Sequence, residues 1–346
     1  MRYFTILLIL ILLSGCGNSN PYEGKTIRLA VVKDFNLPKV SVRAMVLLDK
    51  NVAFAGSDAT FGFINTQNQT MATNNLKNIQ VISDFRAVAA TKERFFMLSI
   101  ANPALLFRAD PTGMKEVYRE EHPEVFYDAM CFIDDQYGIA IGDPIEGRLS
   151  VLTTNNGGLQ WEKKSWSQTP KMAEGEAIFA GSNSAMARVG KKLWIVTGGS
   201  QSRVFYSDNK GYKWEELAVL PLVQGKASQG AFSVDFYDNQ TGVVVGGDYE
   251  NPTHKQGTIA ITADGGKTWR TPATNKVMGY ANCVKYIPNS RGYALMAAAA
   301  DGIYFSADKG DSWQRIANES YHALLFIDEH TMIASGNERI TLFRLF

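Results

Sequence analysis

The chain has 346 residues, 45% of them hydrophobic and 20% charged, which is enough apolar material for a packed core and excludes wholesale disorder. Its 35 Lys and Arg residues nearly balance its 34 Asp and Glu residues. Because binding to phosphates needs clustered basic side chains, we expect no nucleic-acid partner. Three cysteines in so long a chain do not form a disulfide framework.

The first residues have the pattern of a bacterial lipoprotein signal. Arg2 precedes an apolar run over residues 6–13 that is too short to span a bilayer, and Leu-Ser-Gly then leads into Cys16. This lipobox pattern predicts a signal peptide over residues 1–15, a lipidated Cys16 and a polar tether over residues 16–24. The protein is then anchored to a membrane of the bacterial cell envelope and faces the periplasm. The alternative is an ordinary signal peptide in which the cysteine occurs by chance.

From residue 25 onward, short apolar runs alternate with turn residues, and helical periodicity is almost absent. Each unit has a first apolar strand and a returning strand rich in small residues. Seven such units begin at Ser41, Asp84, Phe126, Glu174, Ser228, Tyr280 and Tyr321. Their spacing of about 46 residues has the size of a four-stranded blade. The sequence therefore predicts an all-β fold, a single seven-bladed β-propeller over residues 25–346.

The last unit, from residue 321 to residue 346, is too short for four strands. The run TIRLAVV over residues 26–32 has the composition of a strand and lies outside the other units. We expect this N-terminal strand to complete the last blade, which closes the ring and protects its edges.

Four segments share one turn pattern, with Ser or Thr first, Asp or Asn third, Gly fifth and Trp eighth. They comprise Thr154, Asn156, Gly158 and Trp161; Ser207, Asn209, Gly211 and Trp214; Thr262, Asp264, Gly266 and Trp269; and Ser306, Asp308, Gly310 and Trp313. The pattern suits a tight hairpin, because the polar side chains bond to the turn backbone, Gly adopts positive φ and Trp packs on the hairpin. These segments resemble the Asp-box, or bacterial neuraminidase repeat, which implies a structural role on the face opposite the ligand.

A polar residue stands at or just before the first strand of every unit. These residues are Arg43, Arg86, Asp128, Glu176, Gln229, Asn282 and His322. A second set of loops, expected on the same face, adds Asp58, Asn102, Asp143, Glu146, Arg148, Arg203, Asp248, Tyr249, His254 and Asn337. A water-filled channel mouth would also be polar, but it has no need to separate the two arginines from the two following acids. The segregation of charge favours a ligand pocket.

The units resemble the photosystem II stability/assembly factor-like family of Asp-box propellers, and a group of Bacteroidota lipoproteins catalogued as "oxidoreductase". The resemblance covers about residues 25–346 and rests on the stretches SVRAM, DFRAV, GDPIEGR and GEAIF. It implies that one face of the propeller, bearing arginines, binds a protein partner. No motif supports redox chemistry, because a strand-linked GxGxxG, a haem CxxCH and cluster-type Cys spacing are all missing from the sequence. We therefore expect no cofactor and no metal.

Together these features favour a monomeric, non-catalytic binding module whose ligand is a protein segment or an acidic or glycan molecule. The expected ligand-binding residues are Arg43, Arg86, Asp128, Asp143, Glu176, Arg203 and His322. The alternative is a sialidase-like or other glycoside hydrolase in which Asp128 and Glu176 are the catalytic carboxyls. The Arg-Ile-Pro stretch expected of sialidases is missing, and the nearest sequence is Ile-Arg-Leu at residues 27–29.

Overall fold

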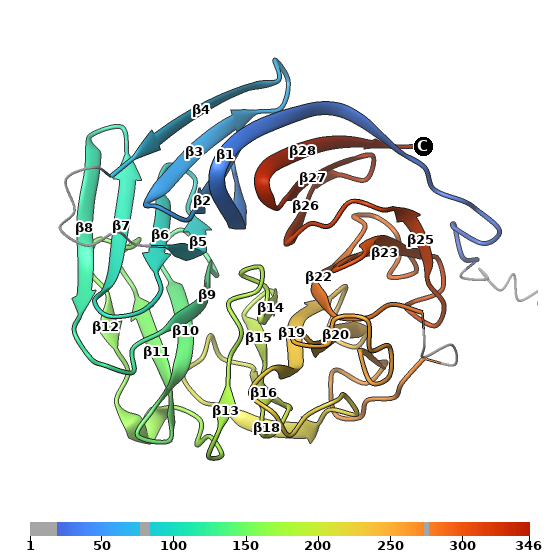
Figure 1. Ribbon diagram of the computed structural model, residues 1–346. Helices are drawn as coiled ribbons and strands as arrows, with labels where there is room; N and C mark the ends of the chain where they lie inside the picture. The colour runs from blue at the N-terminus through green and yellow to red at the C-terminus, as the bar shows by residue number, and fades with distance from the viewer. Residues whose placement is uncertain (1–18, 77–83, 273–276) are drawn as a thin grey trace, which may run out of the picture.

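The computed structural model describes residues 19–76, 84–272 and 277–346, so Cys16 and the expected signal peptide lie outside it. The described part of the chain is all-β, and its single helical element is a 3₁₀ turn, η1 (Trp166–Gln168). No helix in these three ranges has the length and apolarity needed to cross a membrane. Figure 1 shows the sheets following one another around a central axis, which is the arrangement of a β-propeller.

The strands form six antiparallel sheets. The largest has the order β26 (Ala323–Asp328), β27 (Thr331–Ser335), β28 (Asn337–Leu345), β1 (Leu29–Leu48), β2 (Asn51–Gly56), β3 (Thr60–Asn65) and β4 (Thr70–Asn75). The next contains β5 (Phe85–Ala90), β6 (Phe95–Ser99), β7 (Ala104–Asp110) and β8 (Gly113–Glu120). A third contains β9 (Tyr127–Phe132), β10 (Gly138–Ile145), β11 (Arg148–Thr154) and β12 (Glu162–Lys163).

The remaining three sheets complete the ring. One contains β14 (Met186–Val189), β15 (Lys192–Val196), β17 (Arg203–Ser207) and β18 (Glu215–Val219). Its neighbour contains β13 (Glu176–Ala177), β16 (Gly198–Gly199), β19 (Gln229–Phe236), β20 (Gly242–Asp248) and β21 (Ile259–Thr262). The last contains β22 (Ala281–Tyr286), β23 (Leu295–Ala299), β24 (Gly302–Ser306) and β25 (Gln314–Ala317).

The long strand β1 has two partners, one for each half. Residues 29–36 pair with β28, and residues 42–48 pair with β2. The ladder is interrupted between Asn36 and Ser41, where Lys39 has a φ of 66°. Phe35 and Leu37 bury their side chains at this seam. An N-terminal strand thus pairs with β28 as expected, but it begins at Leu29, so that residues 29–36 and not residues 26–32 form the paired stretch.

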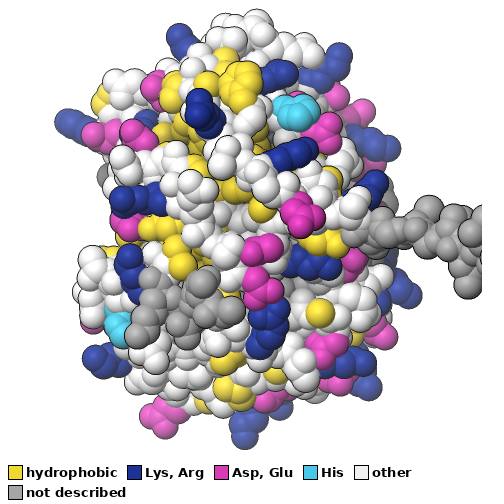
Figure 2. All heavy atoms as spheres, turned by 90° about the vertical axis from the view of Figure 1, so that its right-hand side faces the viewer, with side chains coloured by type: hydrophobic (Ala, Val, Ile, Leu, Met, Phe, Trp, Pro, Cys, Tyr) yellow, Lys and Arg dark blue, Asp and Glu magenta, His cyan; other side chains and the backbone are white. Residues whose placement is uncertain are grey.

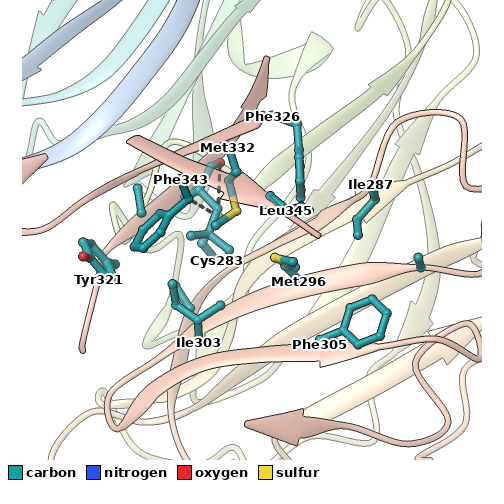
Figure 3. Packing of buried hydrophobic residues seen from close by; sticks show 14 residues of the cluster. Cys283, Ile287, Met296, Ile303, Phe305, Tyr321, Phe326, Met332, Phe343 and Leu345 are labelled. Carbon is teal, nitrogen blue, oxygen red and sulfur yellow. Dashed lines mark hydrogen bonds between the residues drawn. The ribbon is translucent and has the colours of Figure 1, made fainter. Parts of the chain in front are cut away.

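Apolar side chains fill the space between neighbouring sheets. Figure 3 shows the layer between β22–β24 and β26–β28, where Cys283 lies among Met296, Phe326 and Phe343. The Cys283 thiol is fully buried and accepts the backbone N–H of Leu324 at 3.4 Å, as expected for a packed free cysteine.

The four repeated turns share one set of hydrogen bonds. In each, the first hydroxyl donates to the Asp or Asn two residues later over 2.8–2.9 Å and accepts the Gly N–H over 2.8–3.1 Å. The four glycines have φ values of 78°, 83°, 90° and 92°, which L side chains rarely adopt. The expected turn chemistry is confirmed at all four positions.

The fourth unit differs from the expectation that its inner strand starts near Glu174. The strand there, β13, has only two residues and pairs with β16 in the sheet that contains β19. The first strand of the unit's own sheet is β14, which begins at Met186. Residues 178–185, here called the crossing segment, enter the middle of the ring instead (Figure 1). The Asn183 side chain donates to the carbonyl of Val88 at 2.9 Å and accepts the N–H of Met130 at 2.9 Å.

The other polar side chains of the crossing segment bond to the opposite side of the ring. Ser182 donates to the carbonyl of Asn282 in β22 at 2.6 Å, and Ser184 bonds to Ser233 in β19 at 2.7 Å. The segment therefore joins sheets that are not neighbours. Asn183 and Ser182 thereby satisfy backbone groups of β5, β9 and β22.

Candidate ligand pocket

A cavity of about 680 Å³ lies where the inner strands begin. Residues of several sheets line it, among them Arg43, Arg86, Asp143, Phe179, Gly181, Phe232, Tyr249, Tyr280, Asn282 and His322. The repeated turns lie at the other end of the strands: Thr154 pairs with Gly138, which pairs with Phe132, the last residue of β9. The expected separation of turns and pocket is observed.

A β-bulge recurs in five sheets, and in four of them the bulged residue lines the cavity. The ladder between the first and second strands skips one residue, leaving a β-bulge. The skipped residues are Arg43, Arg86, Asp128, Phe232 and Asn282. A bulged residue has no ladder partner, and the local kink turns its side chain out of the regular alternation. In β19 the expected position was Gln229, and the bulge corrects it to Phe232.

Two arginines from neighbouring strands form the positive pole of the pocket. Arg43 Nη1 donates to the carbonyl oxygen of Gly181 at 3.3 Å. Arg86 reaches Asp84 only at 4.0 Å and keeps 32% of its side chain exposed. Burial, and then the charge of Arg86, lower the pKa of Arg43. The two guanidinium groups repel one another, and an anion bound between them would offset this repulsion.

His322 adds no charge to this pole. Burial and the charge of Arg43 lower its pKa to about 4, so the ring is neutral at physiological pH. Its Nε2 lies 3.0 Å from Asn337 Oδ1, while its buried Nδ1 has no hydrogen-bond partner in the described part of the chain. Tyr280 donates its hydroxyl to Asn282 Oδ1 at 2.6 Å. The rim therefore offers neutral polar groups beside two cations.

Two acids, Asp143 and Asp128, lie near the arginine pair. Asp143 lines the cavity and accepts the N–H of Ile178 at 2.8 Å, and burial raises its pKa to about 6. Asp128 is fully buried, and neither carboxyl oxygen has a hydrogen-bond partner among the described residues. Burial, and then the neighbouring Asp143, raise the pKa of Asp128 well above its ordinary value, which favours the uncharged carboxyl. Asp128 does not reach the cavity as a ligand group.

Asp143 makes the stability of the protein depend on pH. Its folded pKa of about 6 exceeds the unfolded value of 3.8, so the folded state binds the proton more tightly and this contribution to stability is lost as pH rises from about 4 to about 6. We expect Asp143→Asn to raise the free energy of unfolding at pH 7 by up to about 3 kcal/mol and to leave it unchanged at pH 4. Urea unfolding of both proteins at several pH values measures the difference. Equal pH profiles would contradict the burial of this carboxylate. The lowered pKa of His322 changes stability with pH in the opposite direction, but it does so equally in both proteins.

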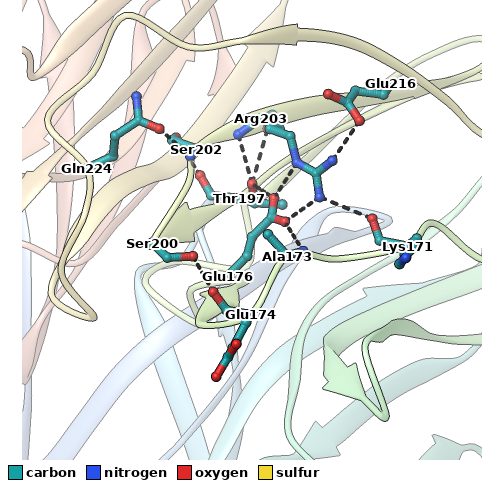
Figure 4. Close-up of polar contacts among 10 residues, drawn as sticks. All are labelled: Lys171, Ala173, Glu174, Glu176, Thr197, Ser200, Ser202, Arg203, Glu216 and Gln224. Carbon is teal, nitrogen blue, oxygen red and sulfur yellow. Dashed lines mark hydrogen bonds and ion pairs between the residues drawn. The ribbon is translucent and has the colours of Figure 1, made fainter.

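Glu176 and Arg203 do not line the cavity, contrary to expectation. Figure 4 shows them bound to one another. The Glu176 side chain is 0% exposed and also accepts the hydroxyl of Thr197 at 2.6 Å. Arg203 donates from Nε to Glu176 at 3.0 Å and from Nη1 to Glu216 at 2.6 Å. Both side chains are therefore occupied in a structural ion pair.

The sequence prediction missed an aromatic wall of the pocket, whose rings come from elements other than the two strands that carry the arginines. Phe179 stacks on Phe232 with ring centroids 3.9 Å apart and planes at 2°. Tyr280 meets Phe232 nearly at right angles at 4.7 Å, and Tyr249 stands edge-on to both phenylalanines. The signal available in the sequence was that large aromatic residues recur at these loop and strand starts.

The described residues contain no group of three or more His, Cys, Asp or Glu side chains placed to hold a metal ion. Figure 2 shows basic and acidic side chains interspersed on the side of the molecule that carries β25.

No family model matches the chain, and no curated protein matches it. Solved structures do match. One is titled "YCF48 bound to D1 peptide": it is 14% identical, has a TM-score of 0.63, and the match covers 90% of this chain and 94% of that one. YCF48 from Cyanidioschyzon merolae is 11% identical with a TM-score of 0.65, over 91% of this chain and 99% of that one. The chain has the fold of these β-propellers.

Proposed function

We propose that this protein is a non-catalytic, assembly-factor-like binding module that holds an acidic segment of a protein partner in the cavity. The observation that carries the proposal is the arginine pair, Arg43 and Arg86. Both line one cavity, and among the described residues no carboxylate pairs closely with Arg43. A similar propeller has been solved with a bound peptide, which supports a peptide as the ligand here.

The glycoside hydrolase alternative has little support. Its two carboxyls are Asp128, which is fully buried, and Glu176, which is paired with Arg203. A glycosidase needs both carboxyls at the scissile bond, about 5–9 Å apart and open to substrate. Neither group lines the cavity.

We further propose that the ring has seven blades. The seven-stranded sheet divides at the interruption in β1: β26–β28 with residues 29–36 form one blade, and residues 42–48 with β2–β4 form another. These two and the five other sheets give seven. The hydrogen bonds of the four turns support their interpretation as Asp boxes. A lipid on Cys16 would hold the monomeric propeller at a membrane of the bacterial envelope, facing the periplasm.

The arginine pair is tested with acidic peptides. We expect an aspartate-containing peptide to bind the wild-type chain, and the double variant Arg43→Gln/Arg86→Gln to bind it at least about a hundredfold more weakly, because each charge-assisted contact contributes about 1.5–3 kcal/mol. Isothermal titration calorimetry measures both affinities. Thermal unfolding of the double variant should be no earlier than that of the wild type, since the change removes a repulsion.

Arg270→Gln/Arg315→Gln is the matched control, because both arginines are exposed and the change in net charge is the same. Equal loss of binding in this control would mean that only overall charge matters. Retained binding in the Arg43/Arg86 variant would refute the site.

A further inference from the structure

The aromatic wall and the arginine pair are parts of one surface. Arg43 bonds to Gly181, two residues along the crossing segment from Phe179. The charges of Arg43 and Arg86 both act on Tyr280, whose pKa is raised by burial and lowered by these charges. Tyr280 in turn packs its ring edge against Phe232. An anion held by the arginines is therefore beside the aromatic rings.

The rings present apolar surface to the cavity. Tyr249 is 47% exposed, and it lines the cavity together with Phe179, Phe232 and Tyr280. The rings contact one another instead of enclosing a space, so they form a wall for packing and not a cage around a cation. A cation is also excluded by the arginines. A ligand that fits both the arginine pair and the aromatic wall has a carboxylate and, next to it, a large apolar or aromatic group.

The crossing segment holds this wall in place. Phe179 is supplied by that segment, which is fixed on both sides of the ring through Asn183 and Ser182. Phe232 is the bulged residue of β19 and occupies the position that carries polar side chains in the other bulges. The bulge of β19 therefore places an apolar side chain on the pocket rim, where three of the other bulges place polar ones.

We infer that the pocket selects peptide segments in which an aromatic side chain adjoins an acidic one, with the ring packed on Phe179 and Tyr249 and the carboxylate on Arg43 and Arg86. This inference rests on the proposed function and adds the sequence preference of the partner. Burial of one phenylalanine side chain is sufficient for a preference of about tenfold or more over serine.

Three probes test the preference on the full chain by calorimetry: N-acetyl-Phe-Asp-amide, N-acetyl-Ser-Asp-amide and N-acetyl-Phe-Asn-amide. We expect the first to bind about tenfold more tightly than the second, and the third to bind weakly because it lacks the carboxylate. Phe179→Ala and Tyr249→Ala should each reduce the Phe-over-Ser preference to about threefold or less while leaving the affinity for the Ser-Asp probe unchanged.

Tyr212→Ala is the matched control, because Tyr212 is 51% exposed in a repeated turn at the other end of the strands. It should keep the full preference. If Phe179→Ala does not fold, Tyr249→Ala decides, since an exposed ring contributes little to the core. Equal affinity of the wild type for the Phe-Asp and Ser-Asp probes overturns this inference alone. Equal affinity for the Asp and Asn probes, or no binding of any probe, counts against the proposed function as well.

Discussion

Arg203→Met lowers the free energy of unfolding by about 3–5 kcal/mol, because it leaves the Glu176 carboxylate buried without its counter-ion. The Arg203 side chain is itself only 10% exposed, so water does not replace it easily. The carboxylate keeps the Thr197 hydroxyl and the N–H of Ala173 as donors, which do not neutralise a charge. Urea unfolding followed by circular dichroism measures the loss as a lower midpoint.

The double variant Glu176→Met/Arg203→Met separates the charge from the packing. Replacing both members of a buried pair by apolar residues is often nearly neutral, so the double variant should be more stable than Arg203→Met alone. Arg315→Met is a suitable control, since its ion pair with Asp301 is exposed and contributes little. A loss under about 1 kcal/mol in Arg203→Met would contradict the burial of this pair.

Removing residues 19–36 abolishes stable closure of the ring. The deletion takes away the whole β28-pairing half of β1 together with the buried side chain of Phe35. We expect a loss of at least about 5 kcal/mol, which is a large part of the stability of a typical domain. The free edge of β28 should then pair with other molecules. Thermal unfolding and size-exclusion chromatography measure the two effects.

A permuted chain provides the control. Arg28 and Phe346 exchange backbone hydrogen bonds of 3.1 Å, so residues 25–38 can follow Phe346 through a short glycine linker and pair as a hairpin. This permuted chain should regain the wild-type unfolding midpoint and remain monomeric. A truncated protein that unfolds at the wild-type temperature would show that the β1–β28 pairing does not close the ring.

The sequence predicted the fold well because its repeats are local. The polar turn residues and Gly158 fix each hairpin through contacts only two to four residues apart. The short last unit indicated a missing strand, which was expected at residues 26–32 and is supplied by residues 29–36. The crossing segment could not be predicted in this way. It begins with a short apolar run like those of the other units. Its course is decided by contacts between Asn183 and residues as far away in sequence as Val88.

The site was predicted only in part, because the local repeat gives the position of some of its residues and contacts between distant residues decide the rest. Counting from the start of each inner strand found Arg43, Arg86, Asn282 and His322, all of which line the cavity. The count was wrong in β19, because a bulge is a property of two paired strands and leaves no mark on one of them. A charged residue in a sequence also does not reveal its partner: Glu176 and Arg203 pair with one another and are not available to a ligand.

The pairing of β1 with β28 also sets an order of events during synthesis. Residues 29–36 leave the ribosome among the first of the described chain, and their partners, residues 337–345, leave last. Until residues 337–345 have been made, the early segment has no partner strand, and Val31 and Val32 remain on its surface even in the folded protein. The pairing of β1 with β28 therefore forms late, and any factor that holds the chain unfolded has to act until residues 337–345 are made.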